Sequence, residues 1–251
     1  MKPKPHTLVV GGTRGIGREV VRHFVRTGHK VTVFGRRVAQ DTGVSSQSVD
    51  LSDHDAVLAA LGAALKASGR LSNLVLLQRY RGEGDLWQGE LDVSLTATKK
   101  IIERLTGEFA RQRRTALSSI VIVGSNASRL IAVEQSVGYH AAKAALGQMA
   151  RYYACALAPR GIRVNCVTPG IVLKDEARKF YRENKGLHDL YRQITPLGRM
   201  GSPKDIADAI RFLCSPSAIF ITGQEIIVDG GLSLLWQGSL ANKLTFPNSL
   251  G

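Results

Sequence analysis

The stretch Val9-Val10-Gly11-Gly12-Thr13-Arg14-Gly15-Ile16-Gly17 decides the fold of this chain. It begins inside a short apolar run, Thr7–Val10, and leads into apolar residues at helical spacing: Ile16, Val20, Val21, Phe24 and Val25. Glycines at a strand-to-helix junction allow a tight turn and let phosphate groups approach the backbone, and the helix N-terminus offers free N–H groups. The pattern therefore predicts a phosphate-binding turn formed by Gly11, Thr13, Arg14, Gly15, Ile16 and Gly17.

Strand-like and helix-like segments alternate over the rest of the chain. Continuous apolar runs predict strands at 30–34, 74–77, 119–123, 163–167 and 225–228, and helical periodicity predicts helices at 56–65, 95–109 and 139–157. Such alternation is typical of a parallel sheet that is covered on both faces. The expected fold is α/β, a Rossmann-like doubly wound parallel sheet in one domain over residues 1–251. Within it, residues 171–201 are expected to form a small helical lid and residues 232–251 an apolar C-terminal tail.

Charge is the unusual feature of the composition. The 251 residues include 34 Lys and Arg against 20 Asp and Glu, a net charge of +14, which suggests an anionic partner. A hydrophobic content of 44% excludes an intrinsically disordered chain. Cys155, Cys166 and Cys214 form no CxxC pair, so neither disulfides nor a metal site is expected. Without a recognisable signal peptide or a long apolar run, the chain is expected to be cytoplasmic, with no membrane partner.

The end of the second predicted strand bears on the choice of nucleotide. In a dinucleotide-binding fold this point lies beside the adenosine ribose, and an acidic residue there binds the free 2′-hydroxyl of NAD. This chain has Gly35-Arg36-Arg37 instead, and a guanidinium suits a 2′-phosphate. Arg36 and Arg37 therefore favour NADP(H) over NAD(H), the alternative being a solvated basic pair.

Further motifs follow in order along the chain: Tyr139-His140-Ala141-Ala142-Lys143, Asn165-Cys166-Val167-Thr168-Pro169-Gly170, and Ile221-Thr222-Gly223-Gln224 with Val228-Asp229-Gly230-Gly231. With the glycine-rich turn, they resemble the short-chain dehydrogenase/reductase family over most of the chain. The resemblance implies hydride transfer between a nicotinamide cofactor and a carbonyl or secondary alcohol. It assigns further cofactor contacts to Asp50, Leu51, Gln78, Tyr139, Lys143, Pro169, Gly170 and Val172.

The catalytic roles also follow from this resemblance. Tyr139 would donate a proton to the developing alkoxide, and Lys143, one helical turn later, would favour its phenolate by positive charge. A free tyrosine has a pKa of about 10, which is too high for easy proton transfer at neutral pH. Ser125 would orient the carbonyl oxygen. The family's serine usually lies thirteen residues before the tyrosine, where this chain has Asn126, so Asn126 is the alternative to Ser125.

Other departures alter the surroundings of these residues. Leu77-Gln78-Arg79-Tyr80-Arg81 stands where the family has an Asn-Asn-Ala-Gly motif, and the segment that follows is shorter than usual, which predicts a loop. The active-site asparagine of the family aligns with Ser94, whose shorter side chain puts the family's proton relay in doubt. Lys174 replaces a threonine and is either a phosphate contact or a solvated lid residue.

The predicted partners follow from the distribution of charge. Residues 1–37 hold nine Lys and Arg against one acidic residue, and residues 171–201 hold seven against four. The basic excess in the lid indicates either an anionic substrate or simply a solvated basic surface. No signature of specific nucleic-acid recognition is present. The alternatives to an enzyme are a non-catalytic nucleotide-binding protein of the same fold and, less favoured, a basic nucleic-acid binder. The apolar tail predicts a homodimer or homotetramer.

Overall fold

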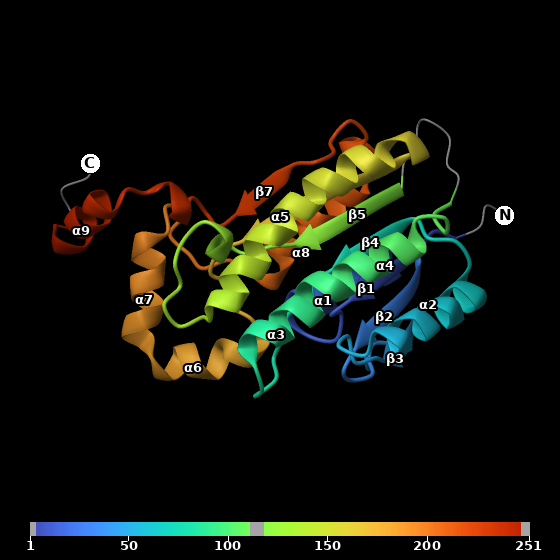
Figure 1. The fold of residues 1–251 in the computed structure, drawn as a ribbon. Helices are drawn as coiled ribbons and strands as arrows, with labels where there is room; N and C mark the ends of the chain where they lie inside the picture. The colour runs from blue at the N-terminus through green and yellow to red at the C-terminus, as the bar shows by residue number, and fades with distance from the viewer. Residues whose placement is uncertain (1–3, 111–117, 247–251) are drawn as a thin grey trace.

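The computed structural model describes residues 4–110 and 118–246, which form a twisted parallel sheet flanked by helices (Figure 1). The sheet has seven strands in the order β3-β2-β1-β4-β5-β6-β7, and every neighbouring pair is parallel. Their bounds are β1 (His6–Val10), β2 (Lys30–Gly35), β3 (Val44–Ser48), β4 (Asn73–Leu76), β5 (Ser118–Val123), β6 (Ile162–Pro169) and β7 (Glu225–Val228). The predicted α/β fold with a doubly wound parallel sheet is confirmed.

Helices cover both faces of the sheet. Helices α1 (Gly15–Arg26) and α8 (Pro203–Cys214) pack on one face, and α2 (His54–Ser68), α4 (Ala97–Leu105) and α5 (Val137–Leu157) pack on the other. Side chains alternate along each strand, so Leu8 and Val10 of β1 join the core under α2, α4 and α5, while Val9 joins the core under α1 and α8. Because both faces are buried, the central strands read as continuous apolar runs.

Strand β3 and helices α8 and α9 (Gln237–Thr245) were not predicted from the sequence, and the helix predicted at 95–109 has different bounds. Strand β3 has the sequence Val-Ser-Ser-Gln-Ser and lies at the edge of the sheet, where a half-exposed strand needs no apolar run. The helix predicted at 95–109 instead begins at Leu86 and continues through α3 (Leu86–Glu90), a π-helical stretch (Leu91–Thr96) and α4. It begins there because the Asp85 side chain caps the N–H groups of Trp87 and Gln88. It ends at Leu105, because Phe109 then bridges to Leu71 beside the sheet.

The segment predicted to be a lid, residues 171–201, contains helices. It consists of a 3₁₀ turn (Asp175–Ala177), α6 (Arg178–Glu183) and α7 (Lys185–Ile194), and it lies at the carboxyl end of the sheet (Figure 1). The C-terminal segment contains a 3₁₀ turn (Leu232–Leu234) and α9 (Gln237–Thr245), which packs against α7. Residues 247–251 of the predicted tail lie outside the described residues. The remaining 3₁₀ turns are Asn126–Ser128, Ala158–Arg160 and Pro216–Ala218.

The strand order reverses between β1 and β4. The chain proceeds outward from β1 to β2 and β3, then returns to start the other half of the sheet at β4. In open parallel sheets the loops diverge at such a point and leave a crevice at the carboxyl ends of the strands. The glycine-rich turn follows β1 and the Gln78–Arg81 segment follows β4, so both lie at this crevice.

Candidate active site

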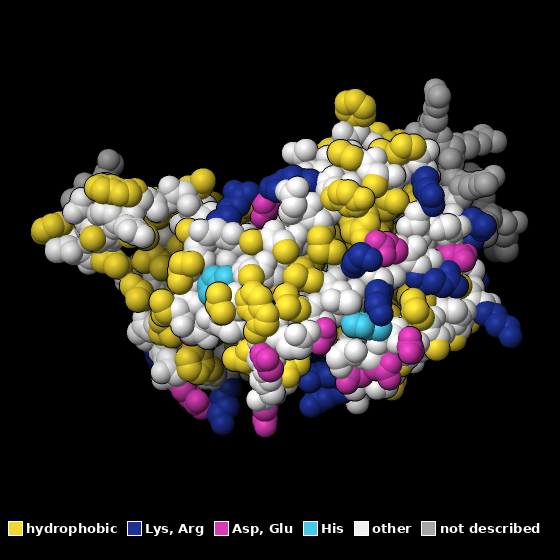
Figure 2. Space-filling model, in the orientation of Figure 1, with side chains coloured by type: hydrophobic (Ala, Val, Ile, Leu, Met, Phe, Trp, Pro, Cys, Tyr) yellow, Lys and Arg dark blue, Asp and Glu magenta, His cyan; other side chains and the backbone are white. Residues whose placement is uncertain are grey.

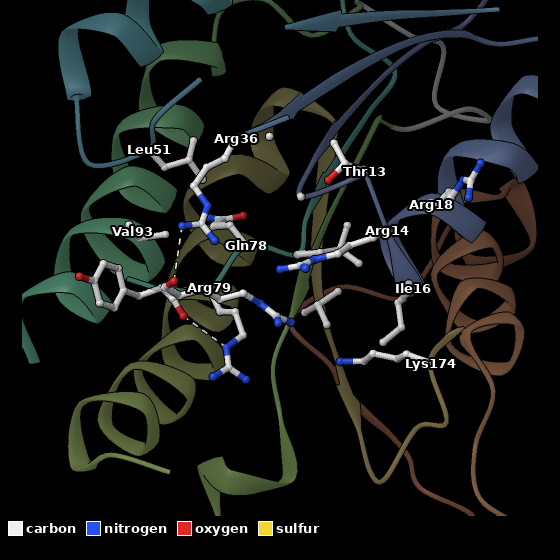
Figure 3. Close-up of a pocket in the computed structure, with 18 of the residues that line it drawn as sticks. Thr13, Arg14, Ile16, Arg18, Arg36, Leu51, Gln78, Arg79, Val93 and Lys174 are labelled. Carbon is white, nitrogen blue, oxygen red and sulfur yellow. Dashed lines mark hydrogen bonds between the residues drawn. The ribbon is translucent and has the colours of Figure 1, made fainter. Parts of the chain in front are cut away.

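A cavity of about 990 Å³ occupies the crevice and brings together nearly all of the predicted site residues (Figure 3). It is lined by every predicted cofactor residue and by Ser125: Gly11, Thr13, Arg14, Gly15, Ile16, Gly17, Arg36, Arg37, Asp50, Leu51, Gln78, Ser125, Tyr139, Lys143, Pro169, Gly170 and Val172. Ser94 does not belong to this lining. Residues that are far apart in the chain therefore converge on one hollow of sufficient size for a dinucleotide.

The glycine-rich turn has the backbone that its sequence predicts. Gly11 and Gly15 have φ angles of 86° and 51°, in the left-handed region that favours glycine. A Cβ at Gly17 would collide with the carbonyl oxygen of Gly11, so only glycine allows this close approach. Arg14 precedes α1 and makes no side-chain cap, which leaves the first N–H groups of the helix without a capping side chain. The turn is therefore a suitable cradle for a phosphate group.

Gln78 offers a second indication that a polar ligand fits here. Its side chain is buried, and its Nε2 donates a 2.6 Å hydrogen bond to Oγ1 of Thr98. Its Oε1 is buried and has no partner among the described residues. A buried acceptor without a donor costs free energy, and a donor group of a bound nucleotide would satisfy it. The residues present thus fit a nicotinamide dinucleotide.

The end of the cavity beside β2 is basic, but Asp50 also lines it. Nη1 of Arg36 donates to the carbonyl oxygen of Arg81 at 3.4 Å, which directs Arg36 across the cavity (Figure 3). Hydrogen bonds from Ser52 lower the pKa of Asp50, and the charge of Arg36 adds to this effect. Asp50 is therefore an acceptor, as an adenine contact requires.

Arg18, Arg22 and Arg26 recur every four residues along α1 and form a basic stripe, which is largely neutralised within the chain. Nε of Arg18 lies 2.9 Å from Asp41 Oδ2, and Nε of Arg22 lies 3.1 Å from Asp41 Oδ1. These two guanidinium groups hold the pKa of Asp41 below its usual range, although partial burial opposes them. Arg26 pairs with Glu19 at 3.5 Å. The stripe consequently offers little unpaired charge for a nucleic acid.

Tyr139 and Lys143 lie in the first turns of α5, where the Ser136 side chain caps the helix by accepting from the Tyr139 N–H at 3.2 Å. The Lys143 side chain is buried, and its Nζ donates to the carbonyl oxygen of Val123 at 3.1 Å. The same Nζ lies 5.6 Å from the centroid of the Tyr139 ring. Burial lowers the pKa of Lys143 to about 8. A lysine with a pKa this close to neutrality can both stabilise a phenolate and exchange a proton.

Ser125 and Asn126 have different surroundings. Ser125 lines the cavity at the carboxyl end of β5, and its Oγ accepts from the Ala127 N–H at 3.2 Å. The Asn126 amide instead donates to Oδ2 of Asp229 at 3.1 Å. Of the two residues, Ser125 is thus the one that lines the cavity, while Asn126 links two loops.

Ser94 lies behind the cavity wall, in the π-helical stretch between α3 and α4. Its hydroxyl is fully buried and donates to Oε2 of Glu90 at 2.5 Å. Glu90 is 3% exposed, and its negative charge raises the pKa of Lys143 against the larger effect of burial. Sequence reasoning missed Glu90, because a lone glutamate in the segment before the helix predicted at 95–109 carries no motif. π-Helical turns inside α-helices are frequent at functional sites.

The short segment after β4 forms a loop, as the sequence predicts. Tyr80 holds it in place, because a Cβ at Gly82 or at Gly89 would collide with the Tyr80 ring. On either side of Tyr80, Arg79 and Arg81 line the cavity. The Cζ of Arg79 lies 4.6 Å from the centroid of the Tyr139 ring. This loop therefore places positive charge beside Tyr139.

Within residues 4–110 and 118–246, no group of three or more His, Cys, Asp and Glu side chains is placed to hold a metal ion. No helix within the same ranges has the length and hydropathy to cross a membrane.

Comparison with known proteins agrees with this architecture. The family model for enoyl-(acyl carrier protein) reductase matches residues 10–233. A 3-oxoacyl-[acyl-carrier-protein] reductase of Staphylococcus aureus is 32% identical, over 92% of this chain and 99% of its own length. A tropinone reductase homolog of Arabidopsis thaliana is 31% identical, over 90% and 93%. The ligand-free aldohexose dehydrogenase of Thermoplasma acidophilum superposes with a TM-score of 0.81 at 26% identity, covering 93% and 96% of the two chains.

Proposed function

Because the chain belongs to the short-chain dehydrogenase/reductase family of oxidoreductases, we propose that it transfers a hydride between NADP(H) and a carbonyl or secondary alcohol. The observation that carries the proposal is that Tyr139 and Lys143 line the same cavity as the glycine-rich turn. A phosphate cradle without these two residues would support nucleotide binding alone. Tyr139 and Lys143 without the phosphate-binding turn would be an ordinary pair of side chains on a helix surface.

The residues of the cavity have distinct roles in this proposal. NADPH, when bound, supplies the hydride. Tyr139 donates the proton that the developing alkoxide needs, and the buried ammonium of Lys143 favours the phenolate that remains. The Ser125 hydroxyl donates a hydrogen bond to the carbonyl oxygen and holds it toward Tyr139. Ser94 acts through Glu90 and not on the substrate, because its hydroxyl is committed to that carboxylate.

The preference for NADP(H) over NAD(H) rests on the end of β2. Gly35, Arg36 and Arg37 line the cavity there, and no acidic residue stands directly at the end of this strand. Two guanidinium groups favour a 2′-phosphate over a free hydroxyl. Lys174 adds a cation near the turn, since its Cδ lies 3.5 Å from the position that a Cβ of Gly15 would take.

The decisive experiment separates binding from turnover. NADPH is titrated by quenching of Trp fluorescence, and NADPH oxidation is then followed with a panel of ketones and aldehydes. Tyr139→Phe should lower kcat by about 10²- to 10⁴-fold and change the Kd for NADPH far less, because it removes the transferable proton and keeps the ring. Tyr152→Phe, on the exposed side of the same helix, is the matched control. Equal turnover in wild type and Tyr139→Phe would exclude Tyr139 as the acid.

A non-catalytic nucleotide-binding role is the second candidate. It is favoured by Ser94, which lies outside the cavity lining and so does not replace the family's asparagine there. This candidate predicts that NADPH binds with micromolar affinity while no carbonyl in the panel is reduced. Failure to bind NADPH or NADH even at millimolar concentration would exclude both candidates.

Assembly is a further part of the proposal. We expect a homodimer or homotetramer of single-domain subunits, because large apolar side chains are exposed near the C-terminus, Leu234 by 84% and Trp236 by 75%. Light scattering coupled to gel filtration tests this expectation. A monomer at micromolar concentration would contradict it.

A further inference from the structure

Three cations from two segments of the chain project into the same cavity. Arg79 and Arg81 come from the loop after β4, and Lys174 comes from the start of the lid. Figure 3 shows Arg79 and Lys174 on opposite sides of the cavity, with the amine of Lys174 pointing across it. This convergence could not be predicted from the sequence, because about ninety residues separate the loop from the lid.

These three side chains lack the carboxylate partners that several other arginines have. Arg18, Arg129 and Arg199 form ion pairs at 2.9, 2.6 and 2.7 Å. Within the described residues, no carboxylate forms an ion pair with Arg79, Arg81 or Lys174. Arg79 donates only to uncharged acceptors, the Gln135 Oε1 at 3.1 Å and the Tyr80 carbonyl oxygen at 3.4 Å. Its guanidinium is thus held in position without being neutralised.

The three charges also act on one another. Partial burial lowers the pKa of Arg81, and repulsion from Arg14 and Arg79 lowers it further. Burial lowers the pKa of Lys174, and repulsion from Arg81 and Arg79 adds to that effect. Glu176 opposes the repulsion at both groups. The mutual repulsion of these cations, opposed by a single carboxylate, is relieved by an anion that binds among them.

The position of Arg79 indicates which molecule carries that anion. The phosphate cradle of the cavity is the turn at Gly11–Gly17, and Arg36 and Arg37 flank its ribose end. Arg79 instead stacks on the ring of Tyr139, the proposed proton donor, at 4.6 Å from its centroid. An anion held by Arg79 would lie next to the reacting carbonyl.

We propose that Arg79, flanked by Arg81 and Lys174, binds a carboxylate or phosphate carried by the substrate, so that carbonyl compounds with such a group are the preferred substrates. This inference rests on the proposed function. Arg79 binds and selects the substrate, whereas Tyr139 carries out the proton transfer. The guanidinium offers two parallel N–H donors, which match a carboxylate or phosphate edge better than an ammonium does.

Matched pairs of probes that differ in charge test the proposal. Benzoylformate and levulinate are each compared with their methyl esters, and dihydroxyacetone phosphate is compared with dihydroxyacetone. The wild type should show a higher kcat/KM for the anionic member of at least one pair. Arg79→Gln should abolish that preference by raising KM about 10- to 100-fold for the anion and little for the neutral member. Arg79→Lys should retain part of the preference for the anionic probe, because lysine keeps the positive charge but lacks the two parallel N–H donors of the guanidinium.

Two controls distinguish the sources of the anion. Arg160→Gln removes an exposed cation far from the cavity and should leave the preference unchanged, which excludes an effect of net charge alone. The Kd for NADPH should change less than about threefold in Arg79→Gln. If that Kd rises while the preference persists, Arg79 serves a cofactor phosphate and the proposal is overturned. A wild type that shows no preference in any pair would also overturn it.

The same design separates this inference from the proposed function. Turnover of the neutral probes without any preference for the anionic ones would support the reductase activity and reject the anion site. If the wild type binds NADPH but turns over no probe, the proposed reductase activity is rejected. The anion site is then tested separately, by calorimetric titration of benzoylformate into the NADP⁺-loaded protein. Binding that Arg79→Gln abolishes would support the anion site, and no binding by the wild type would reject it.

Discussion

The hydroxyl of Ser94 donates a 2.5 Å hydrogen bond to Oε2 of Glu90, one turn earlier on the same helix, and both side chains are buried. The Tyr80 N–H contacts the same oxygen at 3.4 Å, so one carboxylate ties the loop after β4 to the helix. Glu90 also raises the pKa of Lys143. A residue outside the cavity lining thus contributes to the electrostatics of the proposed catalytic pair.

Glu90→Gln should make Lys143 a weaker base. The pKa of Lys143 is about 8 because burial outweighs the attraction of Glu90, so loss of that attraction should lower the pKa further. If turnover needs the charged lysine, activity is lost as the pH rises through this pKa. The basic limb of the kcat profile should therefore move to lower pH in Glu90→Gln. Glu83→Gln, in the exposed part of the loop, is the control, and an unmoved limb in Glu90→Gln would count against the coupling.

Arg36→Asp should reverse the preference between the two nucleotides. The substitution replaces a guanidinium that suits a 2′-phosphate with a carboxylate that repels it and accepts from a free 2′-hydroxyl. We expect NADPH affinity to fall at least tenfold while NADH affinity holds or rises, both measured by fluorescence titration. Equal losses for the two nucleotides would mean that Arg36 does not contact the 2′ position.

Ser125→Ala and Asn126→Ala should fail in different ways. Ser125 lines the cavity, so its loss should lower kcat about 10- to 100-fold in the carbonyl assay. Asn126 donates to Asp229, so its loss should lower the melting temperature by a few degrees and leave kcat nearly unchanged. If Asn126→Ala lost the larger share of kcat, the oxygen-orienting role would belong to the asparagine.

Asp205 should make stability depend on acid pH. Two nitrogens of Arg199 donate to its oxygens at 2.7 and 2.8 Å, and hydrogen bonds from Ser202 add to them. Together they hold the pKa of Asp205 far below its usual 3.8 in the folded chain. A depressed folded-state pKa stabilises above the unfolded pKa, and that stability is lost as the pH falls below about 4.

The measurement compares melting temperatures of wild type and Asp205→Asn across this range. The difference should be largest near neutral pH and shrink on acidification. Ser202→Ala should cost about 1 kcal/mol, because the Ser202 side chain caps α8 by accepting from the Asp205 N–H. A difference between wild type and Asp205→Asn that is independent of pH would contradict the assignment. Asp189→Asn, at an exposed pair with Arg192, is the control.

The sequence was most informative where backbone geometry demands particular residues. Gly11, Gly15 and Gly17 could be assigned because two positive φ angles and one close approach leave few alternatives. The sheet could be predicted because its central strands are buried on both faces. Strand β3 could not, because an edge strand with polar residues has no apolar period to detect.

Two relationships that sequence reasoning missed depend on tertiary proximity. Glu90 matters through its distance from Lys143 and Ser94, and Arg79 matters because its guanidinium lies over the Tyr139 ring. Nothing in the local sequence indicates either relationship. Asp85, by contrast, carried a local signal, since an aspartate before an apolar run is a common helix N-cap.

Tyr80 has a consequence for how this protein can diverge. Its ring packs at the edge of the core and fixes the loop after β4, while its two neighbours, Arg79 and Arg81, face the cavity and contribute nothing to the hydrophobic clusters. Replacement of either arginine therefore leaves the loop anchored and the core intact. Descendants of one ancestral gene can exchange these positions, and with them the ligands they recognise, at little cost in folding. Substitutions at Arg79 and Arg81 can therefore change ligand recognition without being opposed by a loss of fold stability.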